Sequence, residues 1–179
     1  MPEPLGNYVT LTHFFDANLY HDILTGRSVT GILHFLNQTP IDWYAKKQAT
    51  VETATYGSEF VAARTCIEQA MDLRTSLRYL GVPIRQKSII FGDNKSMIDS
   101  ATIPHSMLHK CHTALSWHRV REAIAAGVAA MYHIPGDTNP ADILSKHWGY
   151  ANVWKVLKPI LFWKGDTMDI VDLEAPKEE

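Results

Sequence analysis

Three features that would each define a class of protein are scarce in this sequence. Its 179 residues include two cysteines, too few for a disulfide framework, and this favours a reducing compartment. Its uninterrupted apolar runs are short, which excludes a membrane-spanning helix and a membrane partner. The N-terminus has neither the basic nor the apolar region of a signal peptide. We therefore expect an intracellular protein.

An excess of positive charge is also missing. The chain has 17 basic and 19 acidic residues, for a formal net charge of −2. A domain that held nucleic acid by bulk charge alone would be more basic. Hydrophobic residues make up 46% of the chain, which is typical of a globular domain. We expect one domain at residues 8–163, with a short flank at 1–7 and an acidic tail at 164–179.

The hydrophobic patterns predict an α/β domain with a mixed sheet. Short turns join the first three predicted strands, which favours an antiparallel meander. The longest helix has apolar residues every three or four positions, with Ser58 as its expected N-cap. The predicted strands are residues 8–15, 28–36, 41–45, 88–92 and 128–134, and the predicted helices are 58–80, 96–100, 110–126 and one starting near 141.

Four acidic residues lie at the predicted ends of strands and starts of helices. Asp16 ends the first strand and Asp93 follows the fourth, while Glu59 and Asp142 lie in first helical turns. If they converge at one edge of the sheet, their mutual repulsion calls for cations, and Mg²⁺ is a hard ion that prefers oxygen ligands. Two such ions form the clamp used in phosphodiester displacement.

Ordinary structural roles also explain these positions one by one. Acidic residues are common at helix N-termini because they complement the helix dipole. Asp93 and Asn94 form a dipeptide that is common where a strand meets a turn. The spacing of the four carboxylates leaves both interpretations open.

Six motifs carry a resemblance to a known family. In chain order they are FDAN at 15–18, TGRSVTG at 25–31, PIDWYAKKQ at 40–48, TYGSEF at 55–60, GDNKS at 92–96 and NPADILSK at 139–146. With these motifs the chain resembles the RNase H domain of copia-type LTR retrotransposon Pol polyproteins. The resemblance covers residues 15–148 and implies the RNase H-like fold, a five-stranded mixed sheet with helices on both faces.

The resemblance also implies an activity and a site. The family cleaves the RNA strand of RNA–DNA hybrids during reverse transcription and leaves 3′-hydroxyl and 5′-phosphate ends. Its four catalytic, metal-binding carboxylates fall on Asp16, Glu59, Asp93 and Asp142, which would hold two Mg²⁺ ions, with Mn²⁺ as a substitute. The implied partners are the hybrid and the reverse transcriptase domain of the same polyprotein. The implied location is the cytoplasm, a virus-like particle or the nucleus.

The chain departs from the family pattern at two places. Many members have Ser-Thr-Glu-Ala-Glu where this chain has Tyr56-Gly57-Ser58-Glu59, so Glu59 aligns with the second Glu. Glu52, which precedes the helix, is the alternative. Cellular RNases H have a mobile histidine before the last helix that assists product release. His133 is the candidate here, although a plain position at the strand end also fits.

Contacts with nucleic acid are expected beside the carboxylates and on a basic segment at residues 105–121. The candidates are Asn18, Ser58, Asn94, Lys110, His112, His118 and Arg121. A core-covering helix is the alternative for the basic segment, and its His and Cys residues match no common zinc spacing. Two alternatives remain for the whole chain: a catalytically weak RNase H-fold tether that supports a polymerase, and another nuclease of this fold.

Overall fold

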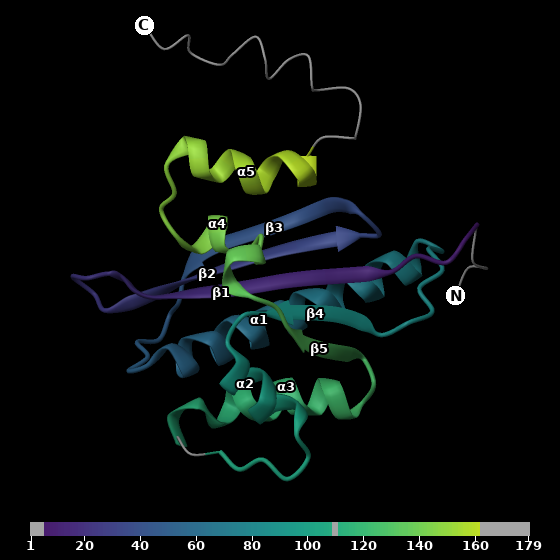
Figure 1. Cartoon of the computed structure of the whole chain (residues 1–179). Helices are drawn as coiled ribbons and strands as arrows, with labels where there is room; N and C mark the ends of the chain where they lie inside the picture. The colour runs from purple at the N-terminus through teal and green to yellow at the C-terminus, as the bar shows by residue number, and fades with distance from the viewer. Residues whose placement is uncertain (1–5, 109–110, 162–179) are drawn as a thin grey trace, which may run out of the picture.

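Five strands form one mixed sheet in the order β3-β2-β1-β4-β5 (Figure 1). The first three are joined as an antiparallel meander, whereas β1, β4 and β5 run parallel. The computed structural model describes residues 6–108 and 111–161, without the side chains of residues 112, 150 and 151. The strands are β1 (Leu11–Asp22), β2 (Arg27–Leu36), β3 (Thr39–Lys47), β4 (Ser88–Gly92) and β5 (Ala129–His133).

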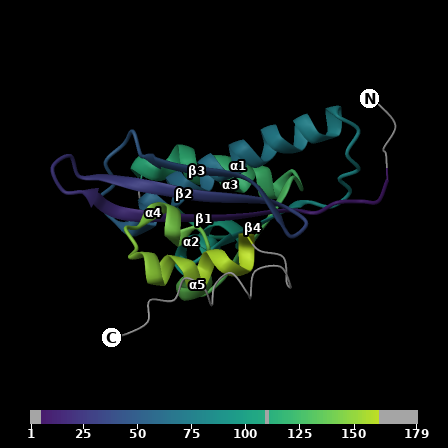
Figure 2. The same cartoon turned by 90° about the horizontal axis from the view of Figure 1, so that it is seen from above.

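Helices cover both faces of this sheet, which confirms the predicted fold class. In Figure 1, α4 and α5 lie on one face, and α1, α2 and α3 lie on the other. Seen from above in Figure 2, α1 runs lengthwise along the sheet. The helices are α1 (Thr55–Tyr79), α2 (Lys95–Thr102), α3 (Ala114–Ala125), α4 (Asp142–Ser145) and α5 (Tyr150–Leu161), with 3-10 turns at Cys111–Thr113 and Gly136–Thr138.

The main core lies between α1 and the sheet. Phe60, Ala63 and Ile67 recur at helical spacing on the buried side of α1, and they pack with Phe15 and Ile32 from the strands. Burial of this apolar surface holds α1 along β1 and β2. The Cys66 thiol is fully buried in this core, and burial raises the pKa of this group.

Two predicted element boundaries are wrong at functional positions. Asp16 does not end its strand, because alternate residues Phe15 and Ala17 continue the buried pattern and β1 stays paired with β2 through Asn18. Helix α1 begins at Thr55, and no side chain caps it. Ser58 instead donates a hydrogen bond to the Thr55 carbonyl, and the neighbouring Glu59 lies in the second turn.

The C-terminal part divides into two helices where one was predicted from residue 141. The short α4 ends at Ser145, and α5 follows after a connection at residues 146–149. Of the predicted flanks, residues 1–5 and 164–179 lie outside the described residues. Within the described ranges, no helix has both the length and the apolarity needed to cross a membrane.

Candidate active site

Strand β1 is longer than its parallel neighbour β4, and this brings two carboxylates together. Phe14 pairs with Phe91 in the last register position of the two strands. Asp16 and Asp93 each lie two residues beyond that pair, so they occupy matching positions where β4 has ended. In a parallel pair, matching positions direct their side chains to the same face. The sheet register therefore sets the spacing of these two carboxylates.

Glu59 approaches the same place from α1. One carboxylate oxygen each from Glu59, Asp16 and Asp93 lie within 4.8 Å of one another. Glu59 is 2% exposed and accepts a hydrogen bond from the backbone of Ala17. Its Oε2 atom has no hydrogen-bond partner among the described residues. Leaving a buried oxygen unpaired is costly, so this atom is available to a ligand.

Two contacts bring the fourth carboxylate, Asp142, close to Asp16: a hydrogen bond from the loop before α4 and the close packing of α4 on β2. Asn139 is buried and donates from Nδ2 to the Phe15 carbonyl over 2.9 Å. Opposite Asp16 in the β1–β2 ladder lies Gly31, where an added Cβ would come within 2.6 Å of the Ala141 carbonyl oxygen. Because Gly31 has no side chain, α4 can rest on β2 beside Asp16.

Two side chains that follow Asp142 complete this half of the site. The Ser145 hydroxyl donates to Asp16 Oδ2. Lys146 Nζ lies 3.9 Å from Asp16 Oδ2 and forms an ion pair with Asp142 Oδ1. Both residues belong to the NPADILSK motif, but no role was predicted for either. Their spacing of three and four residues from Asp142 places them on one helical face with it, and this signal was available in the sequence.

Burial and mutual repulsion raise the pKa of two carboxylates of the cluster, Asp16 and Glu59. Burial raises the pKa of Asp16 to about 6, with Asp93 and Asp142 adding to the rise and Ser145 and Lys146 opposing it. Burial likewise raises the pKa of Glu59 well above its usual value, and Asp16 and Asp93 contribute. Their ionised forms are therefore unfavourable without a nearby cation.

These residues fit a divalent metal site. All donors are carboxylate oxygens, which hard cations such as Mg²⁺ prefer. Glu59 is one of the three residues of the cluster, and its Oε2 atom has no hydrogen-bond partner among the described residues. The alternative Glu52 is buried as well, but it does not belong to this cluster.

The residues beside the carboxylates that were predicted to contact nucleic acid form local hydrogen bonds within the protein. Asn94 Oδ1 accepts from the Met97 backbone and caps α2. Asn18 Nδ2 lies 3.0 Å from His21 Nδ1 in the β1–β2 hairpin. Ser58 is fully buried within α1. Their contacts with nucleic acid stay predictions.

The basic segment is anchored to α2 through Arg121. Its guanidinium stacks on Trp117 and donates to the carbonyls of Ser100, Ile103 and Pro104. Arg121 thus covers the carboxyl end of α2, and a contact with nucleic acid would be additional. His118 is exposed on the same helix. Lys110 lies outside the described residues, and of His112 only the backbone is described.

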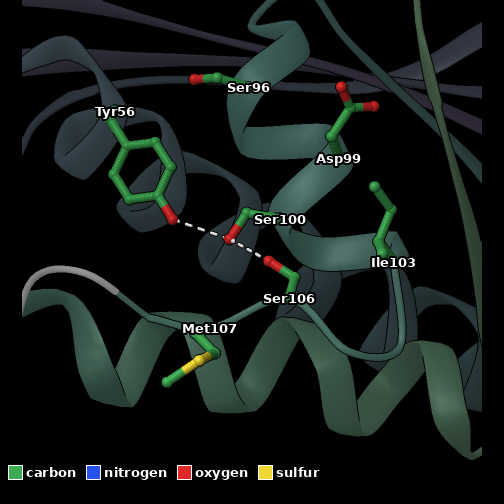
Figure 3. Close-up of a pocket in the computed structure, with 7 residues that line it drawn as sticks. All are labelled: Tyr56, Ser96, Asp99, Ser100, Ile103, Ser106 and Met107. Atoms are coloured by element: carbon green, nitrogen blue, oxygen red, sulfur yellow. Dashed lines mark hydrogen bonds between the residues drawn. The ribbon is translucent and has the colours of Figure 1, made fainter.

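A pocket of about 490 Å³ lies where this segment meets α1 and α2 (Figure 3). Tyr56 and Ser106 point toward Ser100 from opposite sides, with oxygen–oxygen distances of 2.8 and 3.3 Å. Trp117 Nε1 donates to the same Ser100 hydroxyl over 3.1 Å. These hydrogen bonds connect the segment at residues 103–108 to α1, α2 and α3.

His133 lies next to the cluster, at the end of β5. Its Nε2 atom is 3.1 Å from the Asp93 carbonyl oxygen, and its side chain is exposed. The following turn passes close to Asp93, since a Cβ added at Gly136 would lie 3.2 Å from Asp93 Oδ2. Its role in product release stays a prediction.

Two solved structures have a similar fold. The structure of LC11-RNase H1 in complex with an RNA/DNA hybrid matches with a TM-score of 0.60 at 12% identity, covering 75% of this chain and 93% of that chain. RNase H1 from the archaeon Halobacterium salinarum matches with a TM-score of 0.57 at 15% identity, covering 76% and 94%. This chain has the RNase H fold.

The sequence relatives are retrotransposon polyproteins. The retrovirus-related Pol polyprotein from transposon TNT 1-94 of Nicotiana tabacum is 29% identical over 143 residues. That from transposon RE2 of Arabidopsis thaliana is 25% identical over 141 residues. Each match covers 79% of this chain but 10% of the polyprotein. No family model matches the sequence. The predicted resemblance to an RNase H domain of retrotransposon Pol polyproteins is confirmed.

Proposed function

We propose that this chain is a ribonuclease H that hydrolyses the RNA strand of RNA–DNA hybrids with two divalent metal ions. The observation that carries the proposal is the set of Asp16, Glu59 and Asp93 oxygens within 4.8 Å of one another, in an RNase H fold. An LC11-RNase H1 neighbour and a foamy viral protease-reverse transcriptase were solved in complexes with RNA/DNA hybrid. Both support hybrid as the substrate.

In this proposal each carboxylate has a distinct position relative to the scissile phosphate. Asp16 and Asp93 hold the centre, with Glu59 on one side and Asp142 on the other. Bound Mg²⁺ or Mn²⁺ would supply Lewis-acid stabilisation of the displacement and an activated water. Asp16 lies within β1 and Asp93 follows directly on β4, so little reorganisation is expected when substrate binds.

The near-neutral charge of the chain bears on how it finds its substrate. A domain with a formal charge of −2 is expected to bind hybrids weakly and with salt sensitivity. The match spans a tenth of each relative, so in a Pol polyprotein other domains would supply the missing affinity. We propose that a reverse transcriptase domain provides it by tethering, which raises the effective concentration of substrate.

Cleavage of an end-labelled RNA–DNA hybrid with Mg²⁺ or Mn²⁺ tests the function. We expect wild type to cut the RNA strand, Asp93→Asn to be inactive, and neither to cut duplex DNA. The matched control is Asp72→Asn, the same change at an exposed position of α1. Circular dichroism verifies that all three proteins are folded. A folded wild type that leaves the hybrid intact at low salt, also when fused to a reverse transcriptase domain, contradicts the proposal and favours a non-catalytic tether.

A further inference from the structure

The four carboxylates form two unequal halves. In the half made by Asp16, Glu59 and Asp93, the Glu59 Oε2 atom has no hydrogen-bond partner among the described residues. In the half made by Asp16 and Asp142, the Lys146 ammonium group contacts a carboxylate oxygen of each. One half is thus open to a cation, and the other already holds one.

We propose that Lys146 is a removable counter-ion that occupies the place of the second divalent cation until the hybrid binds. The inference rests on the proposed function and adds an order of assembly to it. The free protein would take one divalent cation at Asp16, Glu59 and Asp93. Lys146 would release Asp16 and Asp142 when a backbone phosphate of the hybrid offers it another anionic partner.

The position of Lys146 suits such an exchange. Its backbone is fixed, since its amide donates to the Asp142 carbonyl over 3.0 Å at the end of α4. Its side chain is 42% exposed, whereas those of Asp16 and Asp142 are 3% and 8% exposed. An ion pair with one solvated partner is weak enough to break, and a lysine stem is flexible. The ammonium group can therefore turn outward while the carboxylates stay in place.

Charge balance gives a reason for the exchange. Four ionised carboxylates carry four negative charges, and one divalent cation with Lys146 balances three of them. Two divalent cations balance all four, but then Lys146 is in excess and is repelled. Ser145 keeps its hydrogen bond to Asp16 in either state, so the carboxylate that both halves share does not need to move.

The number and affinity of bound ions test this inference without any catalytic readout. Isothermal titration calorimetry with Mn²⁺, together with electron paramagnetic resonance to count bound ions, is performed on the free protein. We expect wild type to bind one ion well and a second weakly. Lys146→Met is expected to strengthen the second site about tenfold, within the usual range of coupling between sites. Lys146→Arg keeps the charge and should resemble wild type.

A matched control exists in the same domain. Lys47 forms an ion pair with Asp22 at 2.8 Å, and Lys47→Met removes it far from the carboxylate cluster. Thermal unfolding with EDTA identifies any variant that fails to fold, and Lys146→Gln then replaces Lys146→Met. With Ca²⁺ as the divalent cation, addition of a hybrid should raise the affinity of the second metal site in wild type. It should raise that affinity less in Lys146→Met.

The outcomes separate this inference from the proposed function. Two sites of equal affinity in wild type, or a second site unchanged by Lys146→Met, overturn the role of Lys146 and leave the metal-dependent function standing. A second site that Lys47→Met strengthens equally also overturns it, because the effect would then be one of general charge. If none of the variants binds an ion, the proposed function fails together with the inference.

Discussion

Strand β1 carries buried polar groups on both of its faces, and these groups have different partners. Toward α1, His13 Nδ1 lies 2.6 Å from His34 Nδ1 of the neighbouring strand, and His34 Nε2 lies 3.1 Å from Gln69 Oε1. Toward α4, Asp16 meets three other carboxylates and Lys146. Neutral imidazoles can share a proton with each other, whereas ionised carboxylates repel each other and need cations.

The two groups of buried polar side chains differ in whether they indicate function. Burial, with help from His34, lowers the pKa of His13 to about 3, so this side chain stays neutral inside the core. Burial raises the pKa of Asp16 to about 6, which leaves it poorly stabilised in its ionised form. The histidine pair therefore serves folding, and the carboxylates retain an unfavourable arrangement that a ligand can relieve.

The largest effect is expected from Asp16→Asn. We expect hybrid cleavage to fall by about 100-fold or more, because the shared metal ligand loses its charge. The metal-free protein should become more stable by about 2 kcal/mol at pH 7, since the raised pKa reflects a cost of ionisation that Asn does not have. Cleavage rates and chemical unfolding with EDTA measure the two changes. A variant that is both inactive and less stable contradicts this account of the carboxylates.

His34→Ala should lower the stability and leave hybrid cleavage unchanged, which is the opposite of the effect of Asp16→Asn. It leaves His13 and Gln69 without their partner and creates a cavity, so we expect a loss of about 3 kcal/mol of unfolding free energy. Cleavage measured at a temperature where the variant is folded should stay near wild type. Replacing the exposed Tyr79 by Ala is the control and should change neither property. Selective loss of activity in His34→Ala would mean that the pair takes part in catalysis.

Acidification should change the free energy of unfolding in opposite directions through the histidine pair and through the carboxylates. For His13 the folded pKa of about 3 is below the usual 6.5, so acidification from pH 7 to 5 costs about 2 kcal/mol. For Asp16 the folded pKa of about 6 is above its usual value, so the same change contributes about 1 kcal/mol of stability in metal-free protein. Glu59 acts in the same direction as Asp16.

The free energy of unfolding of wild type and Asp16→Asn, measured at pH 7 and pH 5, checks the contribution of Asp16. The variant should lose more stability than wild type between pH 7 and pH 5, because the opposing contribution of Asp16 is gone. Equal losses would show that the ionisation of Asp16 is not coupled to folding.

The smallest effect is expected at Asn94, whose described contacts are internal although it lies beside Asp93. Asn94→Ala removes the cap of α2 and should cost about 1 kcal/mol, while Asn94→Ser keeps a capping oxygen and most of the stability. If the predicted contact with the hybrid also exists, both variants raise the KM for hybrid. A KM that follows stability alone assigns Asn94 to folding.

The local patterns of the sequence predicted most of the elements. The buried strand at 88–92 matches the structure, because a short apolar run followed by Asp93 and Asn94 has few other solutions. The long amphipathic helix was also found, but its start was misplaced by three residues. Ser58 looked like a cap, yet its hydroxyl is used inside the helix and the backbone begins the turn earlier without a side-chain cap.

The sequence by itself determined the order of the strands, the amphipathic face of α1 and the choice of four acidic candidates, because these depend on residues near one another in the chain. Only the tertiary structure decided that Asp16 lies within β1 and that α4 packs closely against Gly31. It also decided that Arg121 covers the carboxyl end of α2 and that Lys146 occupies one half of the site. Each of these depends on a strand register or a contact between distant segments, which local periodicity does not encode.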